Sequence, residues 1–191
     1  MDKKFGFVSL TGRTNVGKST LLNAFFQKKI AITSRKPQTT RNRILGIFSK
    51  GNNQIVFLDS PGVHTGYKRA LNKYMNKTAK ACYEEVDLVV FVVDRDKWQI
   101  EEDNILKNLK DLKKPILLVI NKIDRIKNNN NILPIINKLN SKHSFEAIMP
   151  VSALKKMEVD SLLSKIIETI PSGEFHYLSL IHISEPTRQL C

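Results

Sequence analysis

Short runs of apolar residues alternate along this chain with segments that carry the spacing of amphipathic helices. Four runs are continuous and rich in Val, Ile and Phe, a pattern typical of parallel strands that are buried on both faces. They span residues 5–10, 54–59, 87–94 and 115–121. Weaker strands are expected at 43–50 and 146–152, and helices at 18–28, 68–85, 101–113, 131–141 and 158–170. The alternation predicts a three-layer α/β fold with a mostly parallel six-stranded sheet.

One pair of strands departs from the parallel pattern. Only the turn-forming sequence Lys-Gly-Asn-Asn-Gln separates the strand at 43–50 from the strand at 54–59. A connection this short favours a hairpin, because parallel strands need a long crossover. The sheet is therefore expected to contain one antiparallel strand.

Length and composition set the limits of the domain organisation. The 191 residues suffice for one domain, and Pro171, Ser172 and Gly173 form a natural stop after the last helix. We therefore expect one domain over residues 1–171, followed over 172–191 by a tail that is disordered or non-native fusion sequence. No run approaches the roughly 20 apolar residues of a membrane helix, and the N-terminus does not have the pattern of a secretory signal.

Charge and cysteine content bear on compartment and partners. Two cysteines, Cys82 and Cys191, make neither a disulfide framework nor a metal-binding spacing, which favours the cytoplasm. The net charge of +13 can attract nucleic acid or anionic lipid. It is equally explained by a solvated surface rich in lysine.

The turn after the first strand has the strongest motif in the chain. Residues 12–19 read Gly-Arg-Thr-Asn-Val-Gly-Lys-Ser, which fits the phosphate-binding pattern G-x-x-x-x-G-K-[ST] between a strand and a helix. Backbone N–H groups would surround the phosphates, Lys18 would reach the β- and γ-phosphates, and the Ser19 hydroxyl would bind Mg²⁺. The candidate binding residues are Gly12, Arg13, Thr14, Asn15, Val16, Gly17, Lys18, Ser19 and Thr20. The alternative is an ordinary glycine turn.

A second motif, Asp59-Ser60-Pro61-Gly62, follows the strand at 54–59. A carboxylate at the end of a strand can hold a metal-bound water, and the Gly62 N–H can bond a terminal phosphate. By itself this motif is weak, because an Asx turn before a proline looks the same. Its position at the edge where open α/β sheets bind ligands strengthens the functional interpretation.

Two motifs after later strands indicate recognition of a nucleotide base. In Asn121-Lys122-Ile123-Asp124, the Asp124 carboxylate can accept from two adjacent N–H groups, which guanine has and adenine lacks. Asn121 would fasten neighbouring loops, and the Lys122 stem would cover the base. The alternative is a helix start capped by Asp124. Backbone N–H groups at Ser152, Ala153 and Leu154 could meet the base carbonyl, although this segment also reads as a helix start.

Together with "SRKPQTTR" and "ALNKYMNKTA", these motifs resemble the GTPase domain of the bacterial Era proteins over about residues 5–171. The resemblance implies a Ras-like P-loop fold. It also implies a Mg²⁺-dependent switch that hydrolyses GTP to GDP and phosphate during assembly of the small ribosomal subunit. It further implies rRNA as a partner, a cytoplasmic location, and peripheral contact with the inner face of the cell membrane.

The resemblance also assigns roles to single residues. Thr40 would complete the Mg²⁺ shell with Ser19 and, through water, Asp59. Val63 stands where Ras-like proteins have a glutamine that orients water, so slow hydrolysis is expected unless another group assists. Related GTPases use K⁺ there, and Asn15 matches its ligand. The expected catalytic residues are Lys18, Thr40, Gly62 and Asn15.

Two departures from the family pattern affect the expected function. Thr14 replaces a usual proline, which adds a backbone N–H and loosens the loop. No clamp sequence of an RNA-binding KH domain follows Pro171, so specific RNA binding is expected to be lost. Two alternatives stay open: a non-hydrolysing guanine-nucleotide-dependent module that binds RNA or membrane, and a different P-loop enzyme, such as an ATPase or another assembly GTPase.

Overall fold

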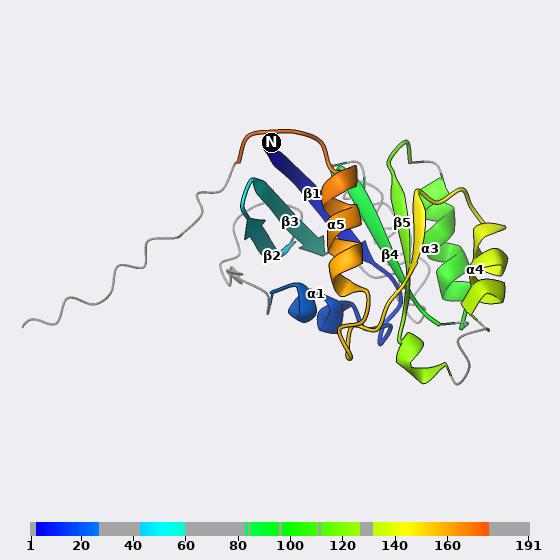
Figure 1. Ribbon diagram of the computed structural model, residues 1–191. Coiled ribbons are helices and arrows are strands. Elements are labelled where there is room, and N and C mark those ends of the chain that lie inside the picture. Colours follow the sequence, from blue (N-terminus) through cyan, green and yellow to red (C-terminus); the bar gives the residue numbers. More distant parts are fainter. Residues whose placement is uncertain are drawn as a thin grey trace, which may run out of the picture.

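The computed structural model describes residues 3–26, 43–59, 83, 85–95, 97–110, 112–126 and 132–175. Within these ranges the chain forms a six-stranded sheet with helices on both faces (Figure 1). Among the helices in the described ranges, none combines the length and the apolar character needed to cross a membrane.

The sheet has the strand order β2-β3-β1-β4-β5-β6. Its strands are β1 (Lys4–Thr11), β2 (Arg43–Lys50), β3 (Asn53–Asp59), β4 (Leu88–Asp94), β5 (Ile116–Asn121) and β6 (Ala147–Pro150). All neighbouring strands pair in parallel except β2 and β3, which are antiparallel across the turn at Gly51 and Asn52. This confirms the predicted mixed sheet and its single hairpin.

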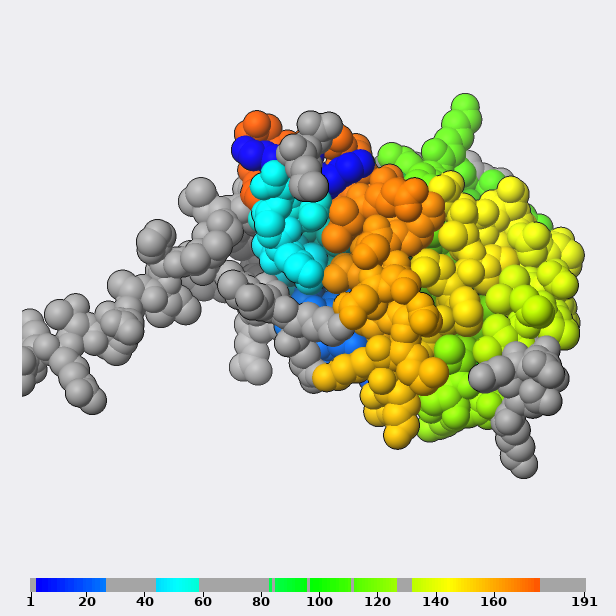
Figure 2. Space-filling model, viewed as in Figure 1, coloured from blue at the N-terminus to red at the C-terminus, as the bar shows by residue number. Residues whose placement is uncertain are grey.

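Helices cover the two faces of the sheet. α1 (Lys18–Phe26) and α5 (Val159–Thr169) pack on one face, and α3 (Ile100–Lys110) and α4 (Ile132–Asn140) lie on the other (Figure 1). In Figure 2, α5 runs down the middle of the visible face between the β2–β3 edge and the α4–β6 edge. The strand β4 is buried along its whole length, with alternate side chains in the two apolar clusters. Burial on both faces explains its uninterrupted apolar sequence.

Helix and strand positions agree closely with those expected from the sequence. The largest difference among the helices within the described ranges is at the C-terminal end of α3, which ends at Lys110 rather than at 113. The helix expected at 68–85 lies outside the described residues apart from Tyr83 and Glu85, and Tyr83 is helical. Its hydroxyl shares a buried hydrogen bond with the Thr11 hydroxyl at 2.8 Å.

The chain stays in contact with the sheet beyond Pro171. Lys4 and Ser172 form an antiparallel bridge, and the Gly173 N–H donates to the Lys3 carbonyl at 3.0 Å. Phe175 packs against the apolar cluster on the α3 side of the sheet. Residues 176–191, which make up most of the expected tail, lie outside the described residues.

Candidate functional site

The expected site residues gather at the carboxyl edge of the sheet. β1 lies between β3 and β4, so the strands that follow it in sequence are added first on its β3 side and then on its β4 side. Such a reversal of strand order leaves a crevice at the strand ends, where open α/β sheets bind ligands. The motif at 12–19 begins at this point, and register pairs Asp94 with Asn121 at the ends of β4 and β5 beside it.

The loop from Gly12 to Gly17 requires glycine at both ends. Gly12 has φ +143° and Gly17 has φ +100°, a backbone conformation that side chains rarely adopt. A Cβ at Gly12 would overlap the Val92 carbonyl oxygen, and a Cβ at Gly17 would overlap the Asn121 side-chain amide. The glycines therefore let the loop lie directly on β4 and β5.

The donor set of this loop fits a phosphate chain. The loop ends at the N-terminus of α1, where N–H groups lack intrahelical partners and the helix dipole is positive. Asn15 has a left-handed φ of 62°, and alternating backbone conformations of this kind turn successive N–H groups toward an anion. Lys18 adds a positive charge at the loop, because its ammonium donates to the carbonyls of Gly12 at 2.6 Å and Arg13 at 2.8 Å.

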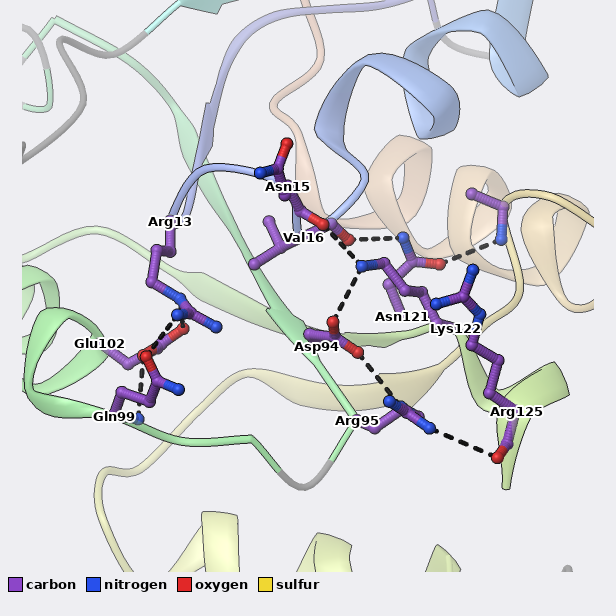
Figure 3. A network of polar contacts seen from close by, with 11 residues as sticks. Arg13, Asn15, Val16, Asp94, Arg95, Gln99, Glu102, Asn121, Lys122 and Arg125 are labelled. Carbon is purple, nitrogen blue, oxygen red and sulfur yellow. Dashed lines mark hydrogen bonds and ion pairs between the residues drawn. The ribbon is translucent and has the colours of Figure 1, made fainter. Parts of the chain in front are cut away.

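The Asn121 side chain joins this loop to the segment after β6. Its Nδ2 donates to the Val16 carbonyl at 2.8 Å, and its Oδ1 accepts from the Ala153 N–H at 3.0 Å (Figure 3). Both hydrogen bonds are buried, so water does not compete for them. The residue expected to fasten neighbouring loops does so here through both ends of one amide.

Lys122 adds a charged connection. Its Nζ donates to the Asn15 carbonyl at 2.6 Å and to Asp94 Oδ2 at 2.8 Å. Burial of Asp94 by itself would raise the pKa of its carboxyl, but hydrogen bonds and charges from Lys122 and Arg95 outweigh it and hold that pKa below its ordinary value. Sequence reasoning missed Asp94. Its position at the end of an apolar run, like that of Asp59 and Asn121, was the signal that could have found it.

Asp124 lies within a short 3₁₀ helix, Ile123–Arg125. The alternative that Asp124 caps a helix is wrong, because Lys122 occupies the position before the helix and makes no side-chain cap. One oxygen of Asp124 accepts a 2.5 Å hydrogen bond from the hydroxyl of Ser152, which is 0% exposed. The Ser152 oxygen in turn accepts from the Lys155 N–H at 3.1 Å. Ser152 therefore fixes the orientation of the carboxylate.

The segment after β6 is a turn and does not start a helix. Ser152 and Met157 exchange two backbone hydrogen bonds, and α5 begins only at Val159. Ala153 is buried, whereas Leu154 is 64% exposed. The alternative interpretation of this segment as a helix start is therefore wrong.

Several expected site residues lie outside the part of the chain that the structure describes. They are Thr40, Ser60, Pro61, Gly62 and Val63. The backbone of Asp59 ends β3, and its side chain is not among those described. Ser19 and Thr20 are exposed in the first turn of α1. Within the described ranges no three His, Cys, Asp or Glu side chains form a metal-binding group. The expected Mg²⁺ ligands are mainly hydroxyl groups, which such a cluster would not include.

Comparison with known proteins places this geometry in a family. Residues 7–122, more than half of the chain, match the profile of the 50S ribosome-binding GTPase family. The chain belongs to this family. It is 43% identical over 172 residues to the GTPase Era of Coxiella burnetii (strain RSA 331 / Henzerling II), an alignment that covers 90% of this chain and 58% of that protein. The predicted resemblance to the Era GTPases is thus confirmed.

Two solved Era structures share the fold. One is Era in complex with MgGDPNP and nucleotides 1506–1542 of 16S ribosomal RNA, at 40% identity and a TM-score of 0.76, covering 92% of this chain and 60% of that one. The other is an Aquifex aeolicus Era variant bound to GDP and AlF₄⁻, at 41% identity and a TM-score of 0.76, covering 91% and 60%. The chain thus spans about three fifths of the length of these relatives.

Proposed function

We propose that this chain binds GTP and GDP at the carboxyl edge of its sheet and, with Mg²⁺, hydrolyses GTP to GDP and phosphate. The observation that carries the proposal is the buried Asn121 amide, which ties the loop at Val16 to the segment at Ala153. A loop suited to phosphate and a carboxylate suited to guanine are thereby held as parts of one site. We take residues 1–171 as the GTP-binding domain.

In this proposal the loop residues Gly12–Thr20 hold the phosphates through backbone N–H groups and Lys18. Mg²⁺, when bound, neutralises charge that develops on the phosphate oxygens. Ser19 and Thr40 would be its protein ligands, Asp59 would hold one of its waters, and the Gly62 N–H would bond the terminal phosphate.

The base would be read by Asp124, whose orientation is set by Ser152. Its carboxylate accepts from the N1 and N2 donors of guanine. Adenine has an acceptor at N1 and no amine at C2, so the same carboxylate would face an acceptor. The N–H groups of Ser152 and Ala153 donate to the Met157 carbonyl and to Asn121 Oδ1, so of the three expected donors the Leu154 N–H would meet the base carbonyl. The stem of Lys122, fixed by Asp94, would cover one face of the base.

Hydrolysis needs help that Val63 cannot give, because an apolar side chain does not orient water. We propose that K⁺, held in part by the exposed Asn15 side chain, supplies positive charge beside the phosphates. Phosphate release measured in K⁺ and in Na⁺ tests this role. Faster release in K⁺ is expected, and its dependence on K⁺ should disappear in Asn15→Ala. Equal rates in both salts would remove Asn15 from catalysis.

The biological role proposed for the whole protein is a switch in assembly of the small ribosomal subunit. One solved Era relative carries 16S ribosomal RNA, and that relative extends well beyond the part matched here. Residues outside this match are therefore expected to provide the specific RNA contacts. Cytoplasmic location and peripheral membrane contact stay predictions from the resemblance.

Titration with a fluorescent GTP analogue and Mg²⁺ tests nucleotide binding directly. Unlabelled GTP and GDP should displace the probe, and ATP should not. Asp124→Asn replaces an acceptor with a donor and should shift the preference toward xanthine nucleotides, which have an oxygen at C2. A flat titration with folded protein would overturn the proposal. An unchanged guanine preference in Asp124→Asn would remove Asp124 from base recognition.

A further inference from the structure

The Arg13 side chain leaves the phosphate loop on the side opposite to Lys122 and reaches α3 (Figure 3). Its Nε donates to Glu102 Oε1 at 3.0 Å, and its Nη1 donates to the side-chain carbonyl of Gln99. Residues 13 and 102 are far apart in sequence, so this contact depends on the packing of α3 beside β4. The motif pattern allows any residue at position 13 and therefore assigns it no such partner.

Glu102 accepts hydrogen bonds from two parts of the chain, the phosphate loop and the start of α3. It is 0% exposed, and its second oxygen accepts from the Gln99 N–H at 2.9 Å. Because Gln99 precedes the first residue of α3 and Glu102 is its third, this is the glutamate half of a capping box. A buried carboxylate is costly unless it is paired. The Arg13 guanidinium, whose side chain is 23% exposed, supplies the compensating charge.

The backbone carbonyl of the same arginine also holds the Lys18 ammonium. The Arg13 carbonyl accepts from Lys18 Nζ at 2.8 Å, next to the Gly12 carbonyl at 2.6 Å. Asn121 and Lys122 hold Val16 and Asn15 from the β5 side. Arg13 thus fixes the loop from the α3 side, and with it the peptide that positions the ammonium.

We propose that Arg13 and Glu102 form a buried ionic anchor that positions the phosphate loop, and that Arg13 is a positioning residue for nucleotide phosphates. This inference rests on the proposed function. Loss of the anchor lets the Arg13 peptide and Lys18 shift, so nucleotide is released faster. The base-reading groups lie on the other side of the loop, so discrimination among bases is unchanged.

The test is the dissociation rate of a fluorescent GDP analogue from the full chain. Arg13→Met should release GDP about tenfold faster. Arg13→Lys keeps the charge but not the forked geometry, and should lie between Arg13→Met and wild type. Glu102→Gln keeps an acceptor for the Gln99 N–H and should speed release about threefold. The Arg13→Met, Glu102→Gln double variant should release GDP no faster than Arg13→Met alone, because both changes remove the same contact between Arg13 and Glu102.

Two comparisons separate positioning from general damage. The ratio of GDP to IDP dissociation rates should stay at its wild-type value in Arg13→Met, since IDP lacks only the base amine. Lys165→Met, which breaks the partly exposed ion pairs of Lys165 with Glu146 and Glu168, is the matched control and should leave release unchanged.

Wild-type release rates in folded Arg13→Met and Glu102→Gln would overturn this inference and leave the proposed function unaffected. Fully additive effects of the two changes, or equal acceleration in Lys165→Met, would also overturn it. A wild-type chain that binds no GDP would overturn the proposed function and this inference together. Circular dichroism at the assay temperature establishes that each variant is folded.

Discussion

Replacing Asp94 by asparagine tests how the Lys122 side of the site is held. Asp94 is 8% exposed, and its carboxylate lies 2.8 Å from Lys122 Nζ and 3.2 Å from Arg95 Nε. At an effective dielectric constant of about 20, the Lys122 contact alone corresponds to about 6 kcal/mol of Coulomb energy. Desolvation of the buried carboxylate cancels most of this, and a charged hydrogen bond contributes about 1.5–3 kcal/mol net.

Asparagine keeps a neutral acceptor worth about 1 kcal/mol, so Asp94→Asn should lower the free energy of unfolding by about 0.5–2 kcal/mol at neutral pH. Burial tends to raise the pKa of Asp94, and Lys122 and Arg95 more than reverse this, so its pKa is lowered in the folded state. The stabilisation is therefore complete above the unfolded pKa of about 4 and is lost as the pH falls through the lower folded value. The difference between wild type and variant should shrink over that range.

Urea unfolding, followed by the fluorescence of Trp98, the single tryptophan of the chain, measures the free energy of unfolding of wild type and variant. Titrations at about pH 7 and at steps down to about pH 3 give the difference as a function of pH. Glu168→Gln is the control, because Glu168 is 71% exposed in its pair with Lys165 and should change stability by less than about 0.5 kcal/mol. A difference that is absent at pH 7, or that persists undiminished in acid, would refute the reasoning.

Three further predictions concern the loop, the base segment and an outlying histidine. Gly17→Ala should abolish measurable nucleotide binding and destabilise the chain by about 2–4 kcal/mol, measured by titration and urea unfolding, because φ is +100° and the new Cβ overlaps the Asn121 amide. Ser152→Ala leaves Asp124 without its serine hydroxyl and should weaken GDP binding about fivefold to tenfold in a competition assay, with binding of a nucleotide-independent antibody as the control. Burial and a neighbouring lysine lower the pKa of His143, so its NMR titration midpoint should lie below that of a model peptide. Stability should then fall as the pH drops below about 6.5, and this fall should be absent in His143→Gln.

The sequence was sufficient to predict every strand of the sheet, for a physical reason. Strands such as β4 and β5 are buried on both faces, so each position along them had to be apolar until the polar residue at its end. That same change of polarity marked Asn121 as a site residue. The hairpin between β2 and β3 was also predictable, because two residues, Gly51 and Asn52, leave no room for a crossover.

Contacts between side chains of distant elements were not predictable. Helical spacing with Ile105, Leu106 and Leu109 puts Glu102 rather than Glu101 on the inner face of α3, but nothing in the local sequence names Arg13 as its partner. The helical spacing of α3 does not fix which loop residue meets Glu102, since that depends on how α3 is placed along the sheet relative to the end of β1. The position of Asp94 at the end of an apolar run could have marked it, but its contact with Lys122 was not predictable, because Lys122 comes from the end of the neighbouring strand.

The arrangement of these contacts implies that the base segment is mechanically coupled to the loop at Asn15 and Val16, whereas the loop at Arg13 is held separately from α3. The Asn121 amide has one donor directed at Val16 and one acceptor directed at Ala153, so neither hydrogen bond can shift without disturbing the other. Lys122 likewise joins Asn15 to Asp94. A disturbance at the base segment must therefore reach the loop through Asn121. The Arg13 anchor approaches from α3 and shares no side chain with that bridge, so it can change phosphate affinity while base preference stays the same.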